Sequence, residues 1–190
     1  LLRRVGDDAL PVYYQLRDDS DSDILAAVST TSADLRFLDV DMWAENLVEL
    51  SNHELPVVRR NLVPSLREYF ETFPDDTRKL LPVMWQDGDE VVRTRMRELL
   101  IKMSDISSTQ FGARITDLNQ HGCDLSALWR LMDARRKGSS EAWKSWLSGE
   151  GEMPETIETM RHVSTMQAPE ELPDLSEALE TLDEELGFLD

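Results

Sequence analysis

The residues best suited to catalysis or metal binding are few and lie far apart in this sequence. His121 and Cys123 form one His-Gly-Cys pair, and the other histidines stand at positions 53 and 162. A zinc site needs three or four such ligands, so a single pair does not predict one. Glycine-rich phosphate loops, nucleophile-elbow patterns and His-Glu-x-x-His are absent. We therefore predict no catalytic residue, no metal ligand and no cofactor.

The charge of the chain narrows the class of partner. Its 190 residues include 38 acidic and 20 basic ones, which gives a net charge of −18. Such an excess of negative charge repels phosphate backbones, so we do not expect nucleic-acid binding. Two interpretations stay open. One is a solvated acidic surface, as in a high-salt cytoplasm, and the other is a surface that meets a basic protein or imitates nucleic acid.

Three further features concern location. No apolar run approaches the ~18 residues that a membrane helix needs, so we expect no membrane segment. The single cysteine excludes an internal disulfide framework and fits a reducing compartment, which predicts a cytoplasmic protein. The sequence opens LLRRVGDD without a methionine, which suggests a fragment of a larger chain.

An internal repeat supplies the elements that must position any functional group. Sliding the sequence against itself places Leu47 on Leu81 and Arg59 on Arg93. In each copy, apolar residues then follow one helix face, at positions 58, 62, 66 and 69 and at positions 92, 96, 100 and 103. A period of roughly 34 residues is typical of stacked helix pairs.

The repeat predicts particular helices and a division of the chain. Two clear copies give helices at about 41–52, 56–73, 75–86 and 89–106, and weaker copies flank them. We predict an all-α fold: a right-handed α-solenoid of antiparallel helix pairs with a C-terminal acidic amphipathic helix. The expected divisions are helical repeats over 1–136, capping helices over 137–167 and an acidic tail over 168–190.

One copy, LLPVMWQDGDEVVRTRMRELL, resembles a HEAT repeat, the armadillo-like family of α-solenoids. In that family a helix with Leu-Leu-Pro leads through an Asp-x-Asp turn into a helix that opens with Val-Arg. The preceding copy keeps Val58 and Arg59 but has His53 at the first aspartate position, and Leu25 and Ala127 replace the arginine in the outer copies. The matching residues are Leu80, Leu81, Pro82, Asp87, Asp89, Val92, Arg93 and Leu99.

The turn residues of this copy have a structural interpretation. Asp87 and Asp89 precede a helix whose first N–H groups lack partners, so their carboxylates can cap it. Arg93 can reach turn aspartates or carbonyls of the next copy, and we interpret Arg59 and Arg93 as structural. Pro64 lies inside a proposed helix and should kink it.

A basic strip is one candidate binding surface. In this class of protein the second helix of each pair often lines a concave side of the fold, and here the predicted second helices are at about 56–73 and 89–106. In that arrangement the concave side gathers Arg60, Arg67, Arg95 and Arg97. The alternative is that neighbouring glutamates, at positions 68, 90 and 98, neutralise the strip through ion pairs on the helix face. The glutamates favour the second alternative.

The C-terminal third offers two more candidates. Trp143 and Trp146 either close the end of the solenoid or anchor a partner, since tryptophan is favoured at binding hot spots. Residues 168–190 include nine acidic residues and no basic one. This tail has a helical stripe that either the last repeat or a partner's groove would cover. The candidate residues of the tail are Leu175, Leu179, Leu182, Leu186 and Phe188.

These observations favour a non-catalytic protein–protein interaction scaffold or adaptor, whose partner is another protein. The architecture alone does not fix function. The resemblance also leaves open an enzyme or enzyme subunit, since HEAT-like repeats occur in bilin lyases and in DNA glycosylases, although a glycosylase needs a basic DNA face. An acidic nucleic-acid mimic that binds a basic protein is the remaining alternative.

Overall fold

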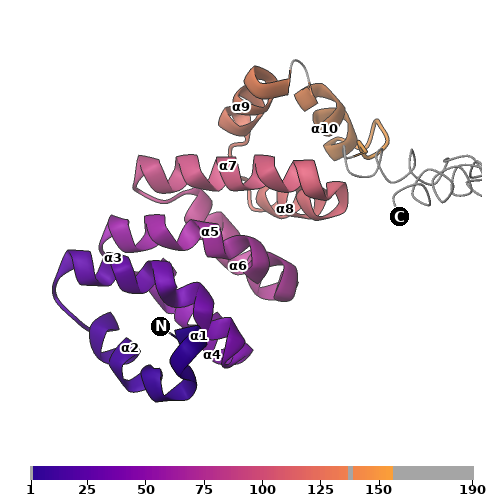
Figure 1. The fold of residues 1–190 in the computed structure, drawn as a ribbon. Coiled ribbons are helices and arrows are strands. Elements are labelled where there is room, and N and C mark those ends of the chain that lie inside the picture. Colours follow the sequence, from indigo (N-terminus) through magenta and orange to yellow (C-terminus); the bar gives the residue numbers. More distant parts are fainter. Residues whose placement is uncertain (1, 137–138, 156–190) are drawn as a thin grey trace, which may run out of the picture. The chain divides into compact units, whose positions relative to one another are not determined.

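A computed structural model describes residues 2–136 and 139–155 of the chain (Figure 1). All of these residues belong to one compact unit, residues 1–157. Within the described ranges every regular element is a helix and no strand occurs, which confirms the all-α prediction. None of the described helices combines the length and the apolar character needed to span a bilayer.

The helices follow one another with short connections. α4 to α7 match the four helices predicted from the repeat to within one residue at each end. In chain order the elements are α1 (Leu2–Val5), η1 (Gly6–Ala9), α2 (Leu10–Arg17), α3 (Ser22–Thr31), η2 (Ser32–Phe37), α4 (Val40–Ser51), α5 (Pro56–Thr72), α6 (Pro74–Trp85), α7 (Glu90–Ile106), α8 (Ser108–Gln120), α9 (Ser126–Arg136) and α10 (Ser139–Leu147), where η1 and η2 are 3-10 helices.

The starting points of the helices keep the period of the sequence. α3, α5 and α7 begin at Ser22, Pro56 and Glu90, and α4, α6 and α8 begin at Val40, Pro74 and Ser108. In both series, each helix therefore starts the same number of residues after the previous one. That separation equals the one between Leu47 and Leu81 in the sequence. The outer copies depart from this plan. α3 has 10 residues and leads into η2, whereas α5 and α7 have 17 each.

Local sequence explains where the helices begin. The Asp89 carboxylate accepts hydrogen bonds from the N–H groups of Val91 and Val92 and caps α7. Asp39 caps α4 and Ser107 caps α8 in the same manner. α5 and α6 instead begin with proline, whose fixed φ suits the first helical position and whose missing N–H costs nothing there.

Two series of helices enclose the core. α3, α5, α7 and α9 contact one another in turn, and so do α4, α6, α8 and α10, while α4 also packs on α5 and α6 on α7. Residues one repeat apart occupy equivalent buried places: Leu47, Leu81 and Ile115 are all fully buried. The buried apolar stripe of each helix therefore drives the stacking.

Candidate functional site

The His-Gly-Cys stretch is the C-terminal cap of α8. Gly122 has φ of 66°, a left-handed conformation that favours glycine. Its N–H donates to the carbonyl of Asn119, and the N–H of Cys123 donates to the carbonyl of Leu118. This pair of bonds is the Schellman arrangement, which satisfies carbonyls at a helix end. The spacing that resembled part of a metal site thus has a structural cause.

Cys123 is a buried thiol whose surroundings favour its protonated form. Its side chain is buried, and Gln86 Nε2 donates to Sγ at 3.3 Å. Burial raises the pKa of Cys123, against the opposing effect of the Gln86 hydrogen bond, so the nucleophilic thiolate is disfavoured. No cluster of three or more histidine, cysteine, aspartate or glutamate side chains suited to a metal occurs in the part of the chain that the structure describes.

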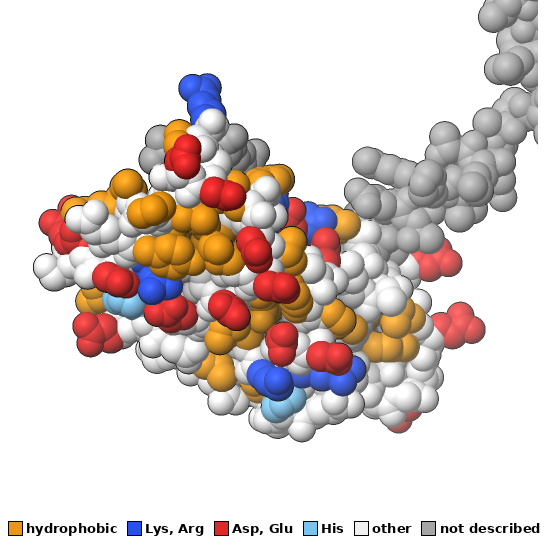
Figure 2. Space-filling view, turned by 90° about the horizontal axis from the view of Figure 1, so that it is seen from below, with side chains coloured by type: hydrophobic (Ala, Val, Ile, Leu, Met, Phe, Trp, Pro, Cys, Tyr) orange, Lys and Arg blue, Asp and Glu red, His pale blue; other side chains and the backbone are white. Residues whose placement is uncertain are grey.

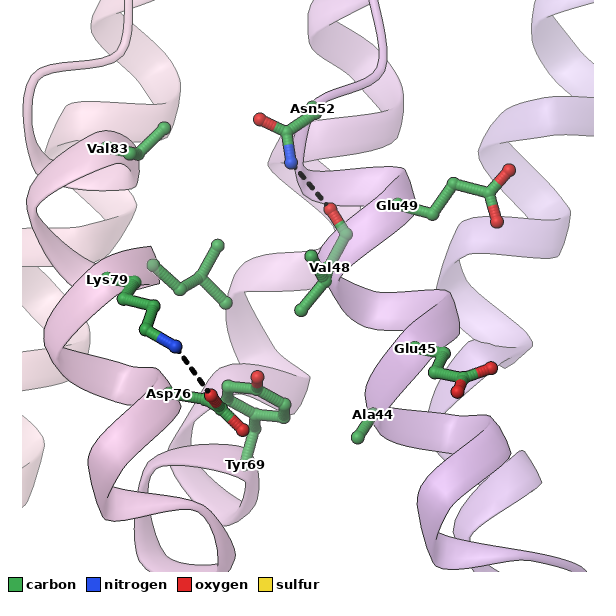
Figure 3. A pocket seen from close by; sticks show the side chains of 10 residues that line it. Ala44, Glu45, Val48, Glu49, Asn52, Tyr69, Asp76, Lys79 and Val83 are labelled. Atoms are coloured by element: carbon green, nitrogen blue, oxygen red, sulfur yellow. Dashed lines mark hydrogen bonds and ion pairs between the residues drawn. The ribbon is translucent and has the colours of Figure 1, made fainter.

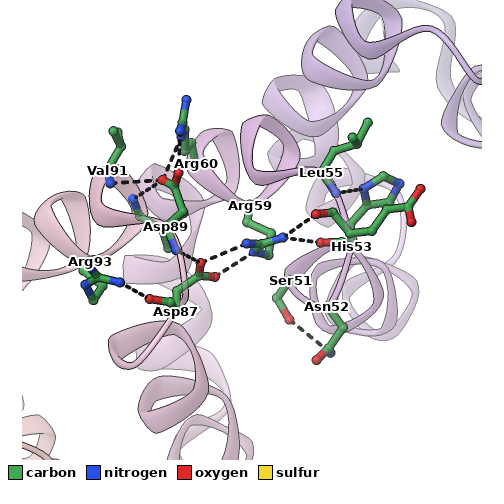
Figure 4. A network of polar contacts seen from close by, with 12 residues as sticks. Ser51, Asn52, His53, Leu55, Arg59, Arg60, Asp87, Asp89, Val91 and Arg93 are labelled. Carbon is green, nitrogen blue, oxygen red and sulfur yellow. Dashed lines mark hydrogen bonds and ion pairs between the residues drawn. The ribbon is translucent and has the colours of Figure 1, made fainter.

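Arg59 connects one repeat to the turn of the next (Figure 4). Its guanidinium forms a two-pronged pair with Asp87, with Nε 2.7 Å from Oδ2 and Nη2 2.9 Å from Oδ1. The same side chain donates to the carbonyls of His53 and Glu54. Burial alone would raise the pKa of Asp87, but the hydrogen bonds from Arg59 and from the N–H of Asp89 outweigh it and hold that pKa below its usual value.

The turn contacts repeat from copy to copy. Arg93 donates to the carbonyl of Asp87, just as Arg59 donates to the carbonyl of His53 one repeat earlier. His53 Nδ1 accepts from the N–H of Leu55 at 3.1 Å, and Asp87 Oδ1 accepts from the N–H of the equivalent residue, Asp89, at 2.8 Å. Histidine therefore replaces aspartate in this turn without loss of its hydrogen bond.

Arg93 itself departs from the sequence-based expectation. It pairs with Glu90 of its own helix instead of a turn of the next copy. The residue one period after Asp87 is His121, which lies in the α8 cap and offers no carboxylate. Among the described residues Arg59 therefore reaches the turn of the next copy, and its pair with Asp87 forms a rung between the two repeats, whereas Arg93 forms none.

The four arginines of the expected basic strip are all engaged within the protein. Arg60 pairs with Asp89 at 2.8 Å, and Arg67 pairs with Glu71 at 3.1 Å. Arg97 pairs with Glu90 at 3.3 Å and lies over the ring of Trp85. The neutralising partners are therefore mostly not the glutamates that sequence suggested, because Glu98 pairs with Arg135 and Glu68 with Arg36.

Arg95 has a different role, since it binds backbone. Pro64 has no N–H to donate to the carbonyl of Arg60, the residue four positions before it in α5. Arg95 Nη1, from α7, donates to that carbonyl at 2.7 Å. One repeat earlier, Asn61 Nδ2 donates to the carbonyl of Ala26 at 3.1 Å. This second set of rungs joins α3 to α5 and α5 to α7.

The two candidate tryptophans pack inside the protein. Trp143 is 4% exposed, with its ring centroid 4.6 Å from that of Phe111 in an edge-on arrangement. Trp146 is half-buried, and its ring centroid lies 5.7 Å from that of Trp143. Through these rings α10 covers the end of α8. Of the two alternatives for these residues, the contacts correspond to closure of the helical stack.

Gly112 permits this closure. A Cβ atom at position 112 would lie 2.9 Å from Trp146 Cη2, which is too close, and 3.1 Å from Met153 Cε, which is a tight contact. Replacing Gly112 with leucine is expected to push Trp146 off α8 and to lower the free energy of unfolding by about 1.5 kcal/mol. Tryptophan fluorescence should shift to longer wavelength, and an unshifted spectrum with unchanged stability would contradict this packing.

An open apolar groove lies between α4 and α6 (Figure 3). It has a volume of about 620 Å³. Tyr69 of α5 reaches into it from behind, with its hydroxyl pointing between the two helices. Val48 and Val83 face it from either side and are 40% and 53% exposed. Its apolar lining is completed by Ala44 and Leu80.

The corresponding place in the next repeat is filled with charged side chains. One period after Ala44, Leu80 and Val83 stand Arg78, Arg114 and Asp117. Arg78 Nε lies 3.5 Å from Asp117 Oδ1, and Arg114, also beside Asp117, is 7% exposed. Burial lowers the pKa of Arg114, against the opposing effect of the Asp117 carboxylate. The groove is therefore open between α4 and α6 and filled between α6 and α8.

Acidic groups border the groove. Glu45 and Glu49 extend from the side of α4 that is turned away from α6 (Figure 3). Glu49 pairs with Arg17 at 2.7 Å, and Asp76 pairs with Lys79 at 3.4 Å. Glu45 has no ion-pair partner among the described residues. Burial, together with the Asp76 carboxylate, raises the pKa of Tyr69 to about 12, so this phenol stays neutral.

Sequence reasoning missed this groove, although a signal was present. The apolar residues at positions 44, 48, 80 and 83 fall partly outside the core stripe, and the next copy has charged residues at three of the corresponding places. The leucines and Phe188 of the predicted acidic tail, residues 168–190, lie outside the described residues.

Comparison with known proteins assigns no family. No protein-family model matches the chain, and neither the curated proteins nor the solved structures contain a match.

Proposed function

We propose that this protein is a non-catalytic scaffold that binds another protein through the groove between α4 and α6. In this proposal its helices form a right-handed α-solenoid of antiparallel, HEAT-like pairs. The equal steps between helix starts and the contacts of each helix with the next but one support that architecture. A cytoplasmic location belongs to the same proposal and is supported by the single, unpaired cysteine.

The observation that carries the proposal is the difference between two equivalent places. Ionic side chains fill the position between α6 and α8, whereas apolar and partly exposed ones leave it open between α4 and α6. Exposed valines in a hollow of this size are typical of a surface that another molecule covers.

A non-catalytic role fits the polar groups of the groove. Figure 3 places Glu45 and Glu49 on the far side of α4, away from the hydroxyl of Tyr69. The pKa of Tyr69 is raised away from neutrality, so this phenol is poorly suited to act as a general base near pH 7. The groove thus combines apolar contact area with few converging polar atoms, as binding surfaces do.

Site-specific crosslinking tests the proposal. Replacing Val48 with the photoreactive residue p-benzoylphenylalanine in the full chain is expected to yield a crosslinked polypeptide of discrete mass in native extract. The same crosslinker in place of Val91, a valine that is also 40% exposed but lies on α7, is the matched control. The proposal fails if no discrete product forms at position 48, or if both positions give the same products.

A further inference from the structure

The chemistry of the groove and the distribution of charge identify the kind of partner. We propose that the groove between α4 and α6 binds a basic amphipathic helix of another protein. This inference rests on the proposed function, because it names the ligand of that same site. The apolar residues of the partner helix would lie on Ala44, Val48, Leu80 and Val83. Its lysines or arginines would meet the carboxylates that border the groove.

Negative charge in the compact unit is concentrated in the N-terminal segment that contains α4. Residues 1–54 contain 12 acidic and 4 basic residues, a net charge of −8. Residues 55–155 contain 16 acidic and 15 basic residues, a net charge of −1. α4 lies within the first of these segments. One face of the molecule accordingly has hydrophobic patches with acidic side chains spread among them and few basic ones (Figure 2).

The individual carboxylates at the groove agree with this distribution. Glu45 is exposed and has no ion-pair partner within the described ranges. The pair between Asp76 and Lys79 is long, at 3.4 Å, and Lys79 Nζ lies on an 84% exposed side chain. Such an exposed pair contributes little, so a basic ligand can replace Lys79 beside Asp76 at small cost. Cationic residues of the partner can therefore pair with Asp76 on the α6 side of the groove and, where the ligand extends over α4, with Glu45 at its outer edge.

The backbone of the groove favours a helical ligand over an extended one. α4 and α6 use their N–H and C=O groups inside their own helices, so they offer no row of free groups for an added strand. A helix satisfies its own backbone and can lie on apolar side chains without leaving polar groups unpaired. The groove-lining residues of α4 and its C-cap run from Ala44 to Asn52, which is about 12 Å along the helix axis, or two turns.

The charge of the chain's own tail also disfavours the tail as the occupant of this groove. Residues 168–190 carry nine acidic residues and no basic one. Placed in this groove, they would add negative charge next to Glu45 and Asp76, which is unfavourable. A separate basic polypeptide has the opposite balance and is attracted by the segment 1–54 before contact.

Synthetic peptides provide the test with the full chain. The probe is a fluorescent helix of about 18 residues with leucines at i, i+3, i+4 and i+7 spacing and lysines elsewhere. One matched peptide replaces every lysine with glutamate, and another keeps the composition in shuffled order. We expect the lysine helix to bind at least about ten-fold more tightly than either. Equal binding of the shuffled peptide, or of the glutamate peptide, overturns the inference.

Two variants locate the binding on the protein. Combining Ala44→Arg with Val83→Asp copies the pair of Arg78 and Asp117 into the groove and adds no net charge. It is expected to weaken the lysine helix at least about ten-fold, with helicity and thermal unfolding unchanged. Exposed Glu45→Lys should weaken it about three-fold and improve binding of the glutamate peptide. Val91→Asp is the control and should change neither affinity.

The outcomes distinguish this inference from the proposed function. A crosslink at position 48 that maps to a segment without basic amphipathic character refutes the helix inference and leaves the scaffold proposal in place. Absence of any discrete crosslink at position 48 removes the scaffold proposal, whatever the peptides do. Undiminished peptide binding to the Ala44→Arg, Val83→Asp chain places the site elsewhere and overturns the inference.

Discussion

Asp87→Ala is expected to lower the free energy of unfolding by about 3 kcal/mol. The substitution leaves the guanidinium of Arg59, whose side chain is 15% exposed, without its two-pronged partner. It also removes the acceptor for the N–H of Asp89 and weakens the turn before α7. Chemical denaturation followed by circular dichroism measures the change.

A double-mutant cycle with Arg59→Ala assigns this loss to the pair. The coupling free energy between the two positions should exceed about 1 kcal/mol. The control is Arg67→Ala, which removes a half-exposed pair with Glu71 on one helix face and should cost no more than about 0.5 kcal/mol. Additive effects of the Arg59 and Asp87 substitutions would show that the rung does not join the repeats.

Acid should weaken the same rung. The pKa of Asp87 is lower in the folded protein than in the unfolded chain, so the unfolded chain takes up the proton first as pH falls. The stabilisation is fully present above the unfolded pKa of about 4 and is lost as pH falls through the folded pKa. The difference in stability between the unsubstituted chain and Asp87→Ala should therefore stay constant near pH 7 and shrink below about pH 4.

Pro64→Ala is the second large expected effect, and its sign is opposite. A proline inside a helix typically costs about 3 kcal/mol, but Arg95 already satisfies the carbonyl that Pro64 leaves free. We expect Pro64→Ala to raise the free energy of unfolding by about 2 kcal/mol. Urea denaturation provides the measurement.

The dependence on Arg95 makes this prediction specific. Arg95→Ala should cost about 1.5 kcal/mol in the presence of Pro64, because the carbonyl of Arg60 then loses its donor. In the Pro64→Ala background the N–H of residue 64 can donate to that carbonyl, so the same substitution should cost clearly less. An equal cost in both backgrounds would disprove the compensation between proline and arginine.

The helices were predictable because their signals are local. Apolar spacing, caps such as Asp89 and the prolines that open α5 and α6 act within a few residues, and the repeat supplied a second copy as a check. The interpretation of Arg59 as a structural residue followed from the same register. Where a copy lacks the partner, as at His121, the expectation for Arg93 was wrong.

Longer-range features were less accessible from sequence. Which glutamate neutralises which arginine depends on how helices from different repeats face one another, so Glu98 meets Arg135 instead of a residue of the expected strip. The burial of Trp143 depends on α10 returning to α8 and on the space above Gly112. The groove becomes visible only when Ala44, Leu80 and Val83 are compared with the residues one repeat later. The apolar stripe of the core does not suggest that comparison.

Arg78, Arg114 and Asp117 stand at the places that Ala44, Leu80 and Val83 occupy one repeat earlier. This difference between repeats bears on how a binding surface arises in such a fold. A backbone that returns at a fixed period presents the same hollow each time, and a handful of side chains determines whether it is vacant or plugged. Recognition can then be gained, lost or moved along such an array by point substitutions, without a new fold. A longer series of such repeats would present several open hollows, in an order set by those few side chains.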